Sequence, residues 1–338
     1  MKAIAYRPGS GLSDPGAFVE IDKADPQPTG HDLVVSVRAV SVNPVDTKVR
    51  DGRVFLGEAV DVLGWDAAGV VVAAGPKASL FGPGDEVFYA GSLLRSGANA
   101  QLHLVDERLV GPKPNLSFAK AAALPLTAIT AWELLFDRLG VAPGKLADGG
   151  SLLVIGGAGG VGSVLIQLAR RLTSLTIIAT ASRPESRDWC LGLGAHAVID
   201  HSGDMAQELR AILAPPITHI AALNETARHW PAIAQIIAPY GKVALITNHD
   251  SLDAAPLRAK SVSLHWQDVV TQMAFGDPSR LAHHKILREV AALVDAGVIV
   301  STATQILSPL SAASLLEAHA LVEGGRMLGK VVVTNDPA

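Results

Sequence analysis

A glycine-rich turn is the part of this sequence whose residue types and spacing most clearly could do chemistry. Ser151–Ile155 is a short apolar run rich in branched residues, which is typical of a strand buried on both faces. It is followed by Gly157, Gly159 and Gly162 in the order G-x-G-x-x-G, and then by Ser163–Arg171, whose apolar residues recur at helical spacing. A strand, a glycine turn and a helix in this order predict a dinucleotide-binding site.

The chemistry of such a turn suits an anionic ligand. The first glycine permits the tight turn, the second lets a diphosphate approach the backbone, and the third lets the helix pack closely on the strand. The N–H groups at the start of the helix would then bind phosphate oxygens. The alternative is a turn without a ligand, but the flanking strand and helix favour dinucleotide binding.

The residues after the second expected strand bear on the choice of nicotinamide cofactor. A unit that prefers NAD usually places Asp or Glu there, about 20 residues after the glycines, to bind the ribose 2′-hydroxyl. Ser182 and Arg183 stand at that place, and Arg187 follows one helical turn later. A guanidinium donates two hydrogen bonds to a phosphate, whereas a carboxylate would repel it. We therefore expect NADPH; the alternative is that the arginines are solvated surface charges and Glu185 is an NAD-type acid.

Length and composition indicate a well-buried protein. A chain of 338 residues predicts about two domains, and 49% apolar with 18% charged residues excludes a disordered chain. A net charge of −4 makes nucleic acid an unexpected partner. The single cysteine, Cys190, excludes an internal disulfide and a multi-cysteine zinc site. No apolar segment at the start is long enough for a signal peptide, so we expect a cytoplasmic protein without a membrane partner.

The elements that must position these residues differ between the two parts of the chain. The first part has the pattern of short strands separated by Pro, Gly and Asp clusters, at Lys2–Tyr6, Leu33–Val40, Val60–Ala73, Leu102–Val105 and Leu109–Val110. Such strands suggest a compact, partly open barrel. A capped helix is expected at Ser117–Leu124, and after Pro125 the helical period continues at Thr127–Leu139.

From Ser151 onward, strands and helices alternate. The expected strands are Ser151–Ile155, Leu175–Ala181, Ala197–Ile199, Thr218–Leu223, Lys242–Thr247 and Ser261–Trp266, with helices between most of them, such as Pro184–Leu193 and Ala206–Leu213. This alternation predicts an α/β fold with a doubly wound parallel sheet. The tail is expected to form helices at Lys285–Ala296 and Ser311–Glu323 and a strand at Gly329–Thr334.

Seven motifs in a fixed order give almost the whole chain a resemblance to the medium-chain dehydrogenase/reductase superfamily. They are Ser41–Arg50 (SVNPVDTKVR), Leu63–Gly69 (LGWDAAG), Gly84–Val87 (GDEV), Leu124–Thr127 with Thr130–Trp132, the glycine turn, Thr180–Glu185 (TASRPE) and Val198–His201 (VIDH). The chain looks closest to the zinc-type alcohol dehydrogenase-like proteins on the quinone oxidoreductase branch. The resemblance implies a GroES-like β-rich catalytic domain with a Rossmann domain inserted, an active site in the cleft between them and, commonly, a homodimer. We therefore expect residues 1–126 to form the N-terminal part of the GroES-like catalytic domain and residues 127–270 to form the Rossmann domain. Residues 271–338 should form a linking helix and then return to the catalytic domain.

The resemblance also implies roles for single residues. The pyrophosphate turn would be formed by Gly157, Gly159, Gly160, Val161 and Gly162, and the 2′-phosphate site by Ser182 and Arg183. Other cofactor contacts would come from Thr127 and Thr130 under the nicotinamide half, His201 at the adenosine phosphate, Asn248 after the fifth strand, and Gly329 with Lys330 near the end of the chain. Asn43, Asp46 and Tyr89 would line the substrate cleft.

The departure from the family's pattern concerns zinc. In the zinc-dependent branch a cysteine precedes the position of Asn43, and Gly-His-Glu stands where this chain has Gly64-Trp65-Asp66. Catalytic zinc needs about three protein ligands and an open position. Because the cysteine, the histidine and the cysteine-rich lobe for structural zinc are all missing, we expect no bound metal. Cys190 lies in an expected Rossmann helix and is expected to be core.

Without a Lewis acid, stabilising the alkoxide of a simple alcohol is difficult, whereas a quinone or an α,β-unsaturated carbonyl delocalises the incoming charge. The leading hypothesis is therefore an NADPH-dependent reductase of such small molecules. Asn43 and Tyr89 are the candidate oxyanion donors, and Asp46 is expected to orient the loop. Each residue also has a structural alternative. Asn43 would set a turn, Asp46 would cap a helical turn, and Tyr89 would belong to the core. The competing hypotheses are an alcohol or aldehyde dehydrogenase with unrecognised zinc ligands and an NADPH-binding module without turnover.

Overall fold

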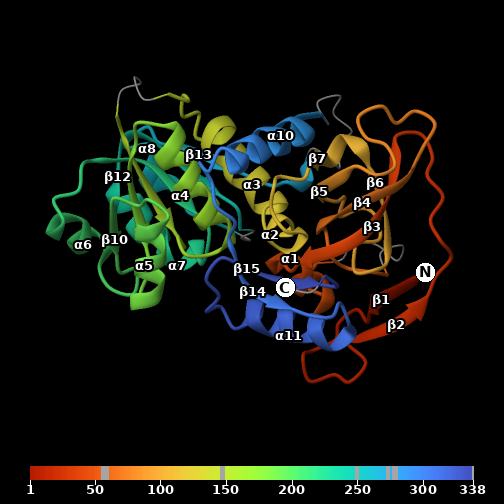
Figure 1. Ribbon diagram of the computed structural model, residues 1–338. Helices are drawn as coiled ribbons and strands as arrows, with labels where there is room; N and C mark the ends of the chain where they lie inside the picture. Colours follow the sequence, from red (N-terminus) through yellow and green to blue (C-terminus); the bar gives the residue numbers. More distant parts are fainter. Residues whose placement is uncertain (55–60, 145–148, 248–250, 272–274, 276–280, 337–338) are drawn as a thin grey trace. The chain divides into compact units, whose positions relative to one another are not determined.

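The computed structural model describes residues 1–54, 61–144, 149–247, 251–271, 275 and 281–336 (Figure 1). The chain divides into two compact units. Unit 1 consists of Met1–Ile129 and Val269–Ala338, and unit 2 consists of Thr130–Asp268. Unit 1 therefore contains both ends of the chain, and unit 2 is inserted between them.

Unit 1 is built on a seven-stranded sheet in which most neighbours are antiparallel. The order is β14-β15-β3-β4-β5-β7, with β6 also paired to β3, and the strands are β3 (Asp32–Ser41), β4 (Asp66–Ala74), β5 (Glu86–Ala90), β6 (Leu102–Asp106), β7 (Val110–Pro112), β14 (Ala303–Leu307) and β15 (Lys330–Thr334). A separate antiparallel pair is formed by β1 (Lys2–Tyr6) and β2 (Phe18–Asp22). Because β15 pairs with β3, with Val332 opposite Ser41, the two ends of the chain meet in one sheet.

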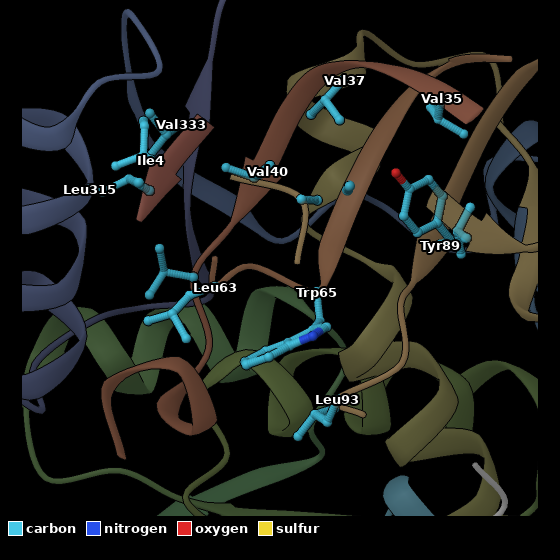
Figure 2. Packing of buried hydrophobic residues seen from close by; sticks show 14 of the residues in the cluster. Ile4, Val35, Val37, Val40, Leu63, Trp65, Tyr89, Leu93, Leu315 and Val333 are labelled. Carbon is cyan, nitrogen blue, oxygen red and sulfur yellow. The ribbon is translucent and has the colours of Figure 1, made fainter. Parts of the chain in front are cut away.

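The helices of unit 1 are short near the N-terminus and longer near the C-terminus. They are α1 (Pro44–Arg50), a 3₁₀ turn (Glu107–Leu109), α2 (Phe118–Ala122), α3 (Pro125–Trp132, which crosses into unit 2), α10 (Leu281–Asp295) and α11 (Ala312–Glu323). The predicted cap of α2 is confirmed, since the Ser117 hydroxyl accepts from the Lys120 N–H at 3.4 Å. Helix α11 packs against β15, and Figure 2 shows the apolar core of this unit, with Trp65 and Tyr89 among its side chains.

Unit 2 is a parallel sheet with helices between its strands. The strand order is β10-β9-β8-β11-β12-β13, formed by β8 (Ser151–Ile155), β9 (Thr176–Thr180), β10 (Ala197–Ile199), β11 (Ile217–Ala222), β12 (Ile237–Leu245) and β13 (Ser263–Trp266). A π-helical turn (Glu133–Arg138) precedes them, and the helices are α4 (Gly160–Leu172), α5 (Pro184–Gly192), α6 (Met205–Ala211), α7 (Thr226–Ile236) and α8 (Ala255–Arg258). The order reverses direction at β8, which is the doubly wound arrangement. The predicted α/β fold class is confirmed.

The predicted strands agree with the structure in most of the chain, and the differences have simple causes. β2, β5 and β14 were not predicted. β2 and β14 carry charged or polar residues at exposed positions, whereas four of the five residues of β5 are apolar or aromatic and buried. The run Phe118–Arg138 is long and apolar enough to span a membrane, but 83% of its most apolar window is buried inside the structure. A buried core segment accounts for that hydropathy.

Candidate active site

The turn between β8 and α4 has the geometry of a diphosphate cradle. Gly156 has a φ of +85°, and the Gly156 N–H donates to the Thr180 hydroxyl at 3.1 Å, which ties the turn to the end of β9. A Cβ on Gly162 would lie 2.5 Å from the Gly156 carbonyl oxygen, and one on Gly157 would lie 2.8 Å from Cβ of Ala179. A Cβ on Gly159 would have no neighbour nearer than 3.6 Å. The turn is therefore tightly packed at its first and third glycines and open at its second, where a diphosphate must approach.

The first turn of α4 supplies donors to the same place. The N-cap residue is Gly159, which has no side chain to cap the helix. The first N–H groups of a helix, here those of Gly160 and Val161, have no acceptor within the helix. These groups and the positive end of the helix dipole suit phosphate oxygens. The residues present thus fit a dinucleotide.

The residues predicted to bind the 2′-phosphate (Ser182 and Arg183) and the adenosine phosphate (His201) lie at one edge of the sheet of unit 2. β9 and β10 are parallel neighbours, and the Ala181 N–H donates to the Ile199 carbonyl at 3.0 Å just beyond their ends. Ser182 and Arg183 follow β9, and His201 follows β10, so all three lie at the carboxyl edge where nucleotides bind in such folds. Arg183 is the N-cap residue of α5.

Two details at this edge were not visible in the sequence. Nη2 of Arg187 donates to the Val198 carbonyl at 2.9 Å, so part of its guanidinium holds β10 in place. The His201 ring lies 5.5 Å from the ring of His229 in an edge-to-face arrangement. Within the part of the chain that the structure describes, Nδ1 of His201 is buried without a hydrogen-bond partner. His229 is thus an additional candidate that only the structure brings to the nucleotide edge.

The remaining predicted cofactor residues are spread over both units. Thr127 and Thr130 lie in α3 one turn apart, and the Thr127 hydroxyl donates to the Leu124 carbonyl at 2.9 Å. Gly329 has a φ of +55° and immediately precedes β15. Asn248 lies outside the described residues. The roles of all these residues toward a cofactor stay predictions.

Lys330, Asn43 and Asp66 form a buried polar cluster in unit 1. Nζ of Lys330 donates to the Val42 carbonyl at 2.7 Å and to Oδ1 of Asn43 at 2.6 Å, and it lies 3.5 Å from Oδ2 of Asp66. Nδ2 of Asn43 donates to the same Oδ2 at 2.8 Å, and the Leu126 N–H donates to Oδ1 of Asp66 at 2.7 Å. Lys330 is 4% exposed and Asp66 is fully buried. The ammonium of Lys330, predicted to contact a cofactor, is therefore engaged within unit 1.

Asp46 lies beside this cluster and holds two backbone segments together. Its Oδ2 accepts from the Asn43 N–H at 2.7 Å, and its Oδ1 accepts from the Gly64 N–H at 3.1 Å. Asn43 is the N-cap residue of α1 and Asp46 is its third residue. The bond from the Asn43 N–H to Asp46 therefore caps the start of α1, which is the alternative role predicted for Asp46. Burial raises the pKa of Asp46 to about 7, and burial also raises the pKa of Asp66, against the opposing effect of Lys330.

Tyr89 is fully buried and is paired with a histidine that the sequence did not single out. The Tyr89 hydroxyl lies 3.0 Å from Nδ1 of His103, whose Nε2 lies 3.1 Å from the Ser96 carbonyl oxygen. Burial raises the pKa of Tyr89 and lowers that of His103 to about 4. The period-two alternation of β6, with His103 and Val105 facing inward, was the signal that could have identified His103.

A zinc site does not fit these residues. Trp65 stands where zinc-dependent relatives have histidine, and its Nε1, which carries a proton and cannot bind a metal, donates to the Arg95 carbonyl at 3.4 Å. Asp66 is already bonded to Asn43, Leu126 and Lys330. The described residues contain no group of three or more His, Cys, Asp or Glu side chains that could hold a metal ion. Cys190 is buried in α5, and burial raises its pKa to about 12.

A small cavity of about 210 Å³ lies elsewhere on unit 1. It is lined by Ser92, Leu94, Arg95, Leu104, Val105, Asp106 and Leu109. None of the predicted catalytic residues lines it. Arg95 pairs with Asp32 at 2.8 Å, and Asp106 pairs with Arg108, so the charged groups around this cavity neutralise one another.

Comparisons with known proteins agree with this architecture. Residues 29–117 match the alcohol dehydrogenase GroES-like domain, and residues 193–333 match the zinc-binding dehydrogenase family. A zinc-type alcohol dehydrogenase-like protein of Staphylococcus aureus is 36% identical over 336 residues, which cover 98% of this chain and 99% of the relative. An NADPH-dependent alkenal/one oxidoreductase of Arabidopsis thaliana is 35% identical over 187 residues, covering 52% of this chain and 47% of the relative.

A solved structure from Rhizobium etli, named as a candidate zinc-dependent alcohol dehydrogenase, is similar over the whole chain. It has a TM-score of 0.94 and 47% identity, and the match covers 100% of this chain and 99% of that one. The near-complete coverage by the Staphylococcus aureus relative establishes the family, and the resemblance predicted from the seven motifs is confirmed. The chain is therefore an oxidoreductase that belongs to the zinc-type alcohol dehydrogenase-like proteins of the medium-chain dehydrogenase/reductase superfamily.

Proposed function

We propose that the protein is an NADPH-dependent reductase of quinones or α,β-unsaturated carbonyl compounds that works without a catalytic zinc. The observation that carries the proposal is the pairing of Asp66 with Lys330, next to the buried Trp65. This segment replaces the Gly-His-Glu of the zinc-dependent branch. At these positions the chain has the indole of Trp65 and a carboxyl, that of Asp66, which lies beside the Lys330 ammonium.

The choice of acceptor follows from the chemistry of the negative charge. A zinc ion stabilises the alkoxide of a simple aldehyde or alcohol as a Lewis acid. A conjugated acceptor needs less help, because the charge spreads over the enolate or hydroquinone as hydride adds and a solvent proton completes the product. The Arabidopsis thaliana relative is an NADPH-dependent alkenal/one oxidoreductase, which supports this class of substrate.

The chain's own residues bind and orient the reactants. Bound NADPH would supply the hydride from C4 of its nicotinamide. The amides of Gly160 and Val161 at the start of α4 bind the diphosphate, and Arg183 recognises the 2′-phosphate. Asn43, Asp46 and Tyr89 act as positioning residues, because the polar atoms of each already bond to protein groups.

The test is an assay of NADPH oxidation with panels of quinones, enones and simple aldehydes, with and without a chelator. We expect turnover of the first two panels, no effect of chelation, and much less than one zinc per chain by elemental analysis. Aldehyde turnover that is lost on chelation would establish a zinc enzyme instead. Tight NADPH binding without turnover of any panel would establish a binding module.

The cofactor preference is tested separately with Arg183→Ala. Losing a charge-assisted contact of about 1.5–3 kcal/mol should weaken NADPH binding about 10- to 100-fold and leave NADH binding unchanged. The control is Arg210→Ala, which removes an exposed arginine of α6. Wild-type protein that binds NADH more tightly than NADPH would overturn the assignment.

We also propose a cytoplasmic homodimer whose partners are small molecules. The net charge of −4 argues against a nucleic-acid surface. β13 is one of the two edge strands of the sheet of unit 2, and Trp266 on this strand is 58% exposed. An exposed aromatic side chain on an edge strand supports pairing with a second copy.

A further inference from the structure

Three ionisable groups, Asp46, Asp66 and Lys330, are buried together in unit 1. Asp46 and Asp66 are fully buried, and the only cation that the structure places against Asp66 among its described residues is Lys330. Two ionised carboxylates and one ammonium would leave a net negative charge in an apolar interior. Since an unpaired buried charge is costly, burial favours the protonated form of one of the two carboxyls.

The hydrogen bonds decide which carboxyl is ionised. Asp66 accepts from Asn43 Nδ2 and the Leu126 N–H and lies next to the Lys330 ammonium. Asp46 accepts only the Asn43 and Gly64 N–H groups among the described residues and has no ion pair there. A nearby cation and several donors favour the charged form of a carboxyl, whereas burial favours the neutral form. Asp66 is therefore the carboxylate, and Asp46 holds the proton.

The ionised Asp66 acts on the start of α3. Its Oδ1 is 2.7 Å from the Leu126 N–H, the second residue of α3. A carboxylate at this position satisfies one of the unpaired N–H groups and complements the helix dipole. Thr127 and Thr130 belong to the same helix. The orientation of these threonines therefore depends on the hydrogen bond from the Leu126 N–H to Asp66. Asp66 is a charged acceptor because the Lys330 ammonium lies beside it.

We propose that Lys330 is a positioning residue for hydride transfer. It is an internal cation that keeps Asp66 ionised and thereby fixes the start of α3. The proposal rests on the proposed reductase function only for the expected effect on kcat. The charge relationship, in which Lys330 keeps Asp66 ionised, concerns residues of unit 1 alone. The ammonium also holds Asn43, so that one side chain near the C-terminus joins the segments around Val42 and Asp66.

The kinetic test compares Lys330→Met, Asp66→Asn and the double variant. In Lys330→Met, Asp66 loses its cation and should take up a proton, and we expect kcat to fall about 100-fold while the Kd for NADPH changes less than about threefold. Asn at position 66 can still accept from the Leu126 N–H without needing a cation. The double variant should therefore recover about tenfold in kcat over Lys330→Met, a non-additive result.

The control is Lys260→Met. Nζ of Lys260 donates to the carbonyls of Ala234, Gln235 and Ile237, so this change also removes a lysine that binds carbonyl oxygens. It should lower the free energy of unfolding and leave kcat and its pH profile unchanged. If Lys330→Met lowers stability as Lys260→Met does but keeps the wild-type kcat, Lys330 is merely structural and the proposal fails.

A second measurement does not depend on turnover. In protein labelled with ¹³C at the aspartate carboxyl groups, the Asp66 signal at neutral pH should be that of a carboxylate in the wild type and that of a protonated carboxyl in Lys330→Met. A carboxylate signal that is unchanged in the variant would overturn the proposal. If the acceptor panels show no turnover but this shift occurs, the reductase function fails and the charge relationship stands.

Discussion

The Tyr89 hydroxyl donates a hydrogen bond to Nδ1 of His103. The separation is 3.0 Å, and the direction follows from the other ring nitrogen, because Nε2 faces the Ser96 carbonyl at 3.1 Å and must carry the hydrogen. With its pKa lowered to about 4, His103 is neutral near pH 7, so its Nδ1 is free to accept. The Tyr89 hydroxyl, which was predicted to be an oxyanion donor, is thus hydrogen-bonded to a buried side chain of unit 1.

This pairing predicts the outcome of Tyr89→Phe. The change leaves Nδ1 of His103 buried without a donor, which should lower the free energy of unfolding by about 1–3 kcal/mol. Because the hydroxyl is not directed at a substrate, kcat should fall less than about tenfold. Denaturant unfolding and steady-state assays check both values, with Tyr240→Phe at an exposed tyrosine as the control. A loss of kcat of more than about 100-fold would restore Tyr89 as the oxyanion donor.

The same histidine should make the protein sensitive to acid. His103 has an ordinary pKa of 6.5 that is lowered to about 4 in the folded protein, so between these pH values the unfolded chain binds a proton that the folded chain does not. The contribution of His103 to the free energy of unfolding is therefore fully present above pH 6.5 and is lost as the pH falls towards 4. The loss from this one group is about 3 kcal/mol. His219 and His319, lowered to about 4 and about 3, act in the same direction.

The variant His103→Asn isolates this contribution, because its side-chain oxygen can accept from Tyr89 and does not titrate. Urea unfolding at several pH values from 4.5 to 7.5 should show a shallower dependence on pH in the variant than in the wild type. Parallel curves for the two proteins would contradict the assignment of a neutral, buried His103.

The glycine turn gives a sharper test with a matched control. In Gly162→Ala, the new Cβ would lie 2.5 Å from the Gly156 carbonyl oxygen, so the start of α4 must shift away from β8. We expect the Kd for NADPH to rise about 10- to 100-fold as the helix amides lose their alignment. Gly192→Ala, in α5 where no atom lies within 4 Å, should leave NADPH binding unchanged. Calorimetric titration of both variants with NADPH measures the difference. Equal affinities would contradict the assignment of the β8–α4 turn as the diphosphate-binding site.

The proposed dimer is tested at the edge strand β13. Trp266→Lys places a charge on this edge strand and should convert a dimer into monomers, as sedimentation velocity would show. The control is Leu213→Lys, since Leu213 is 90% exposed and follows α6 away from this edge. A variant that sediments as a dimer, or a wild type that is monomeric, would exclude β13 as the interface.

The nucleotide-binding half could be predicted from the sequence because its signals are local. The strand Ser151–Ile155, the glycines and the helix are consecutive, and each position is determined by the geometry of one turn. The positions of Ser182, Arg183 and His201 at one edge also follow, because residues after parallel neighbouring strands must meet. Their contacts could not be predicted, and neither the Arg187 bond to the Val198 carbonyl nor the approach of His229 has a local signal.

The sequence by itself determined the family, the α/β fold and the mismatch with zinc ligands, since these depend on residue types in a fixed order. Only the tertiary structure decided what the polar residues of the catalytic unit do. Lys330 and Asn43 are 287 positions apart, and the pairing of β15 with β3 brings their side chains within 2.6 Å. A contact of that range depends on how strands pair across a sheet and on which buried charges neutralise one another, and neither is encoded in the spacing of neighbouring residues.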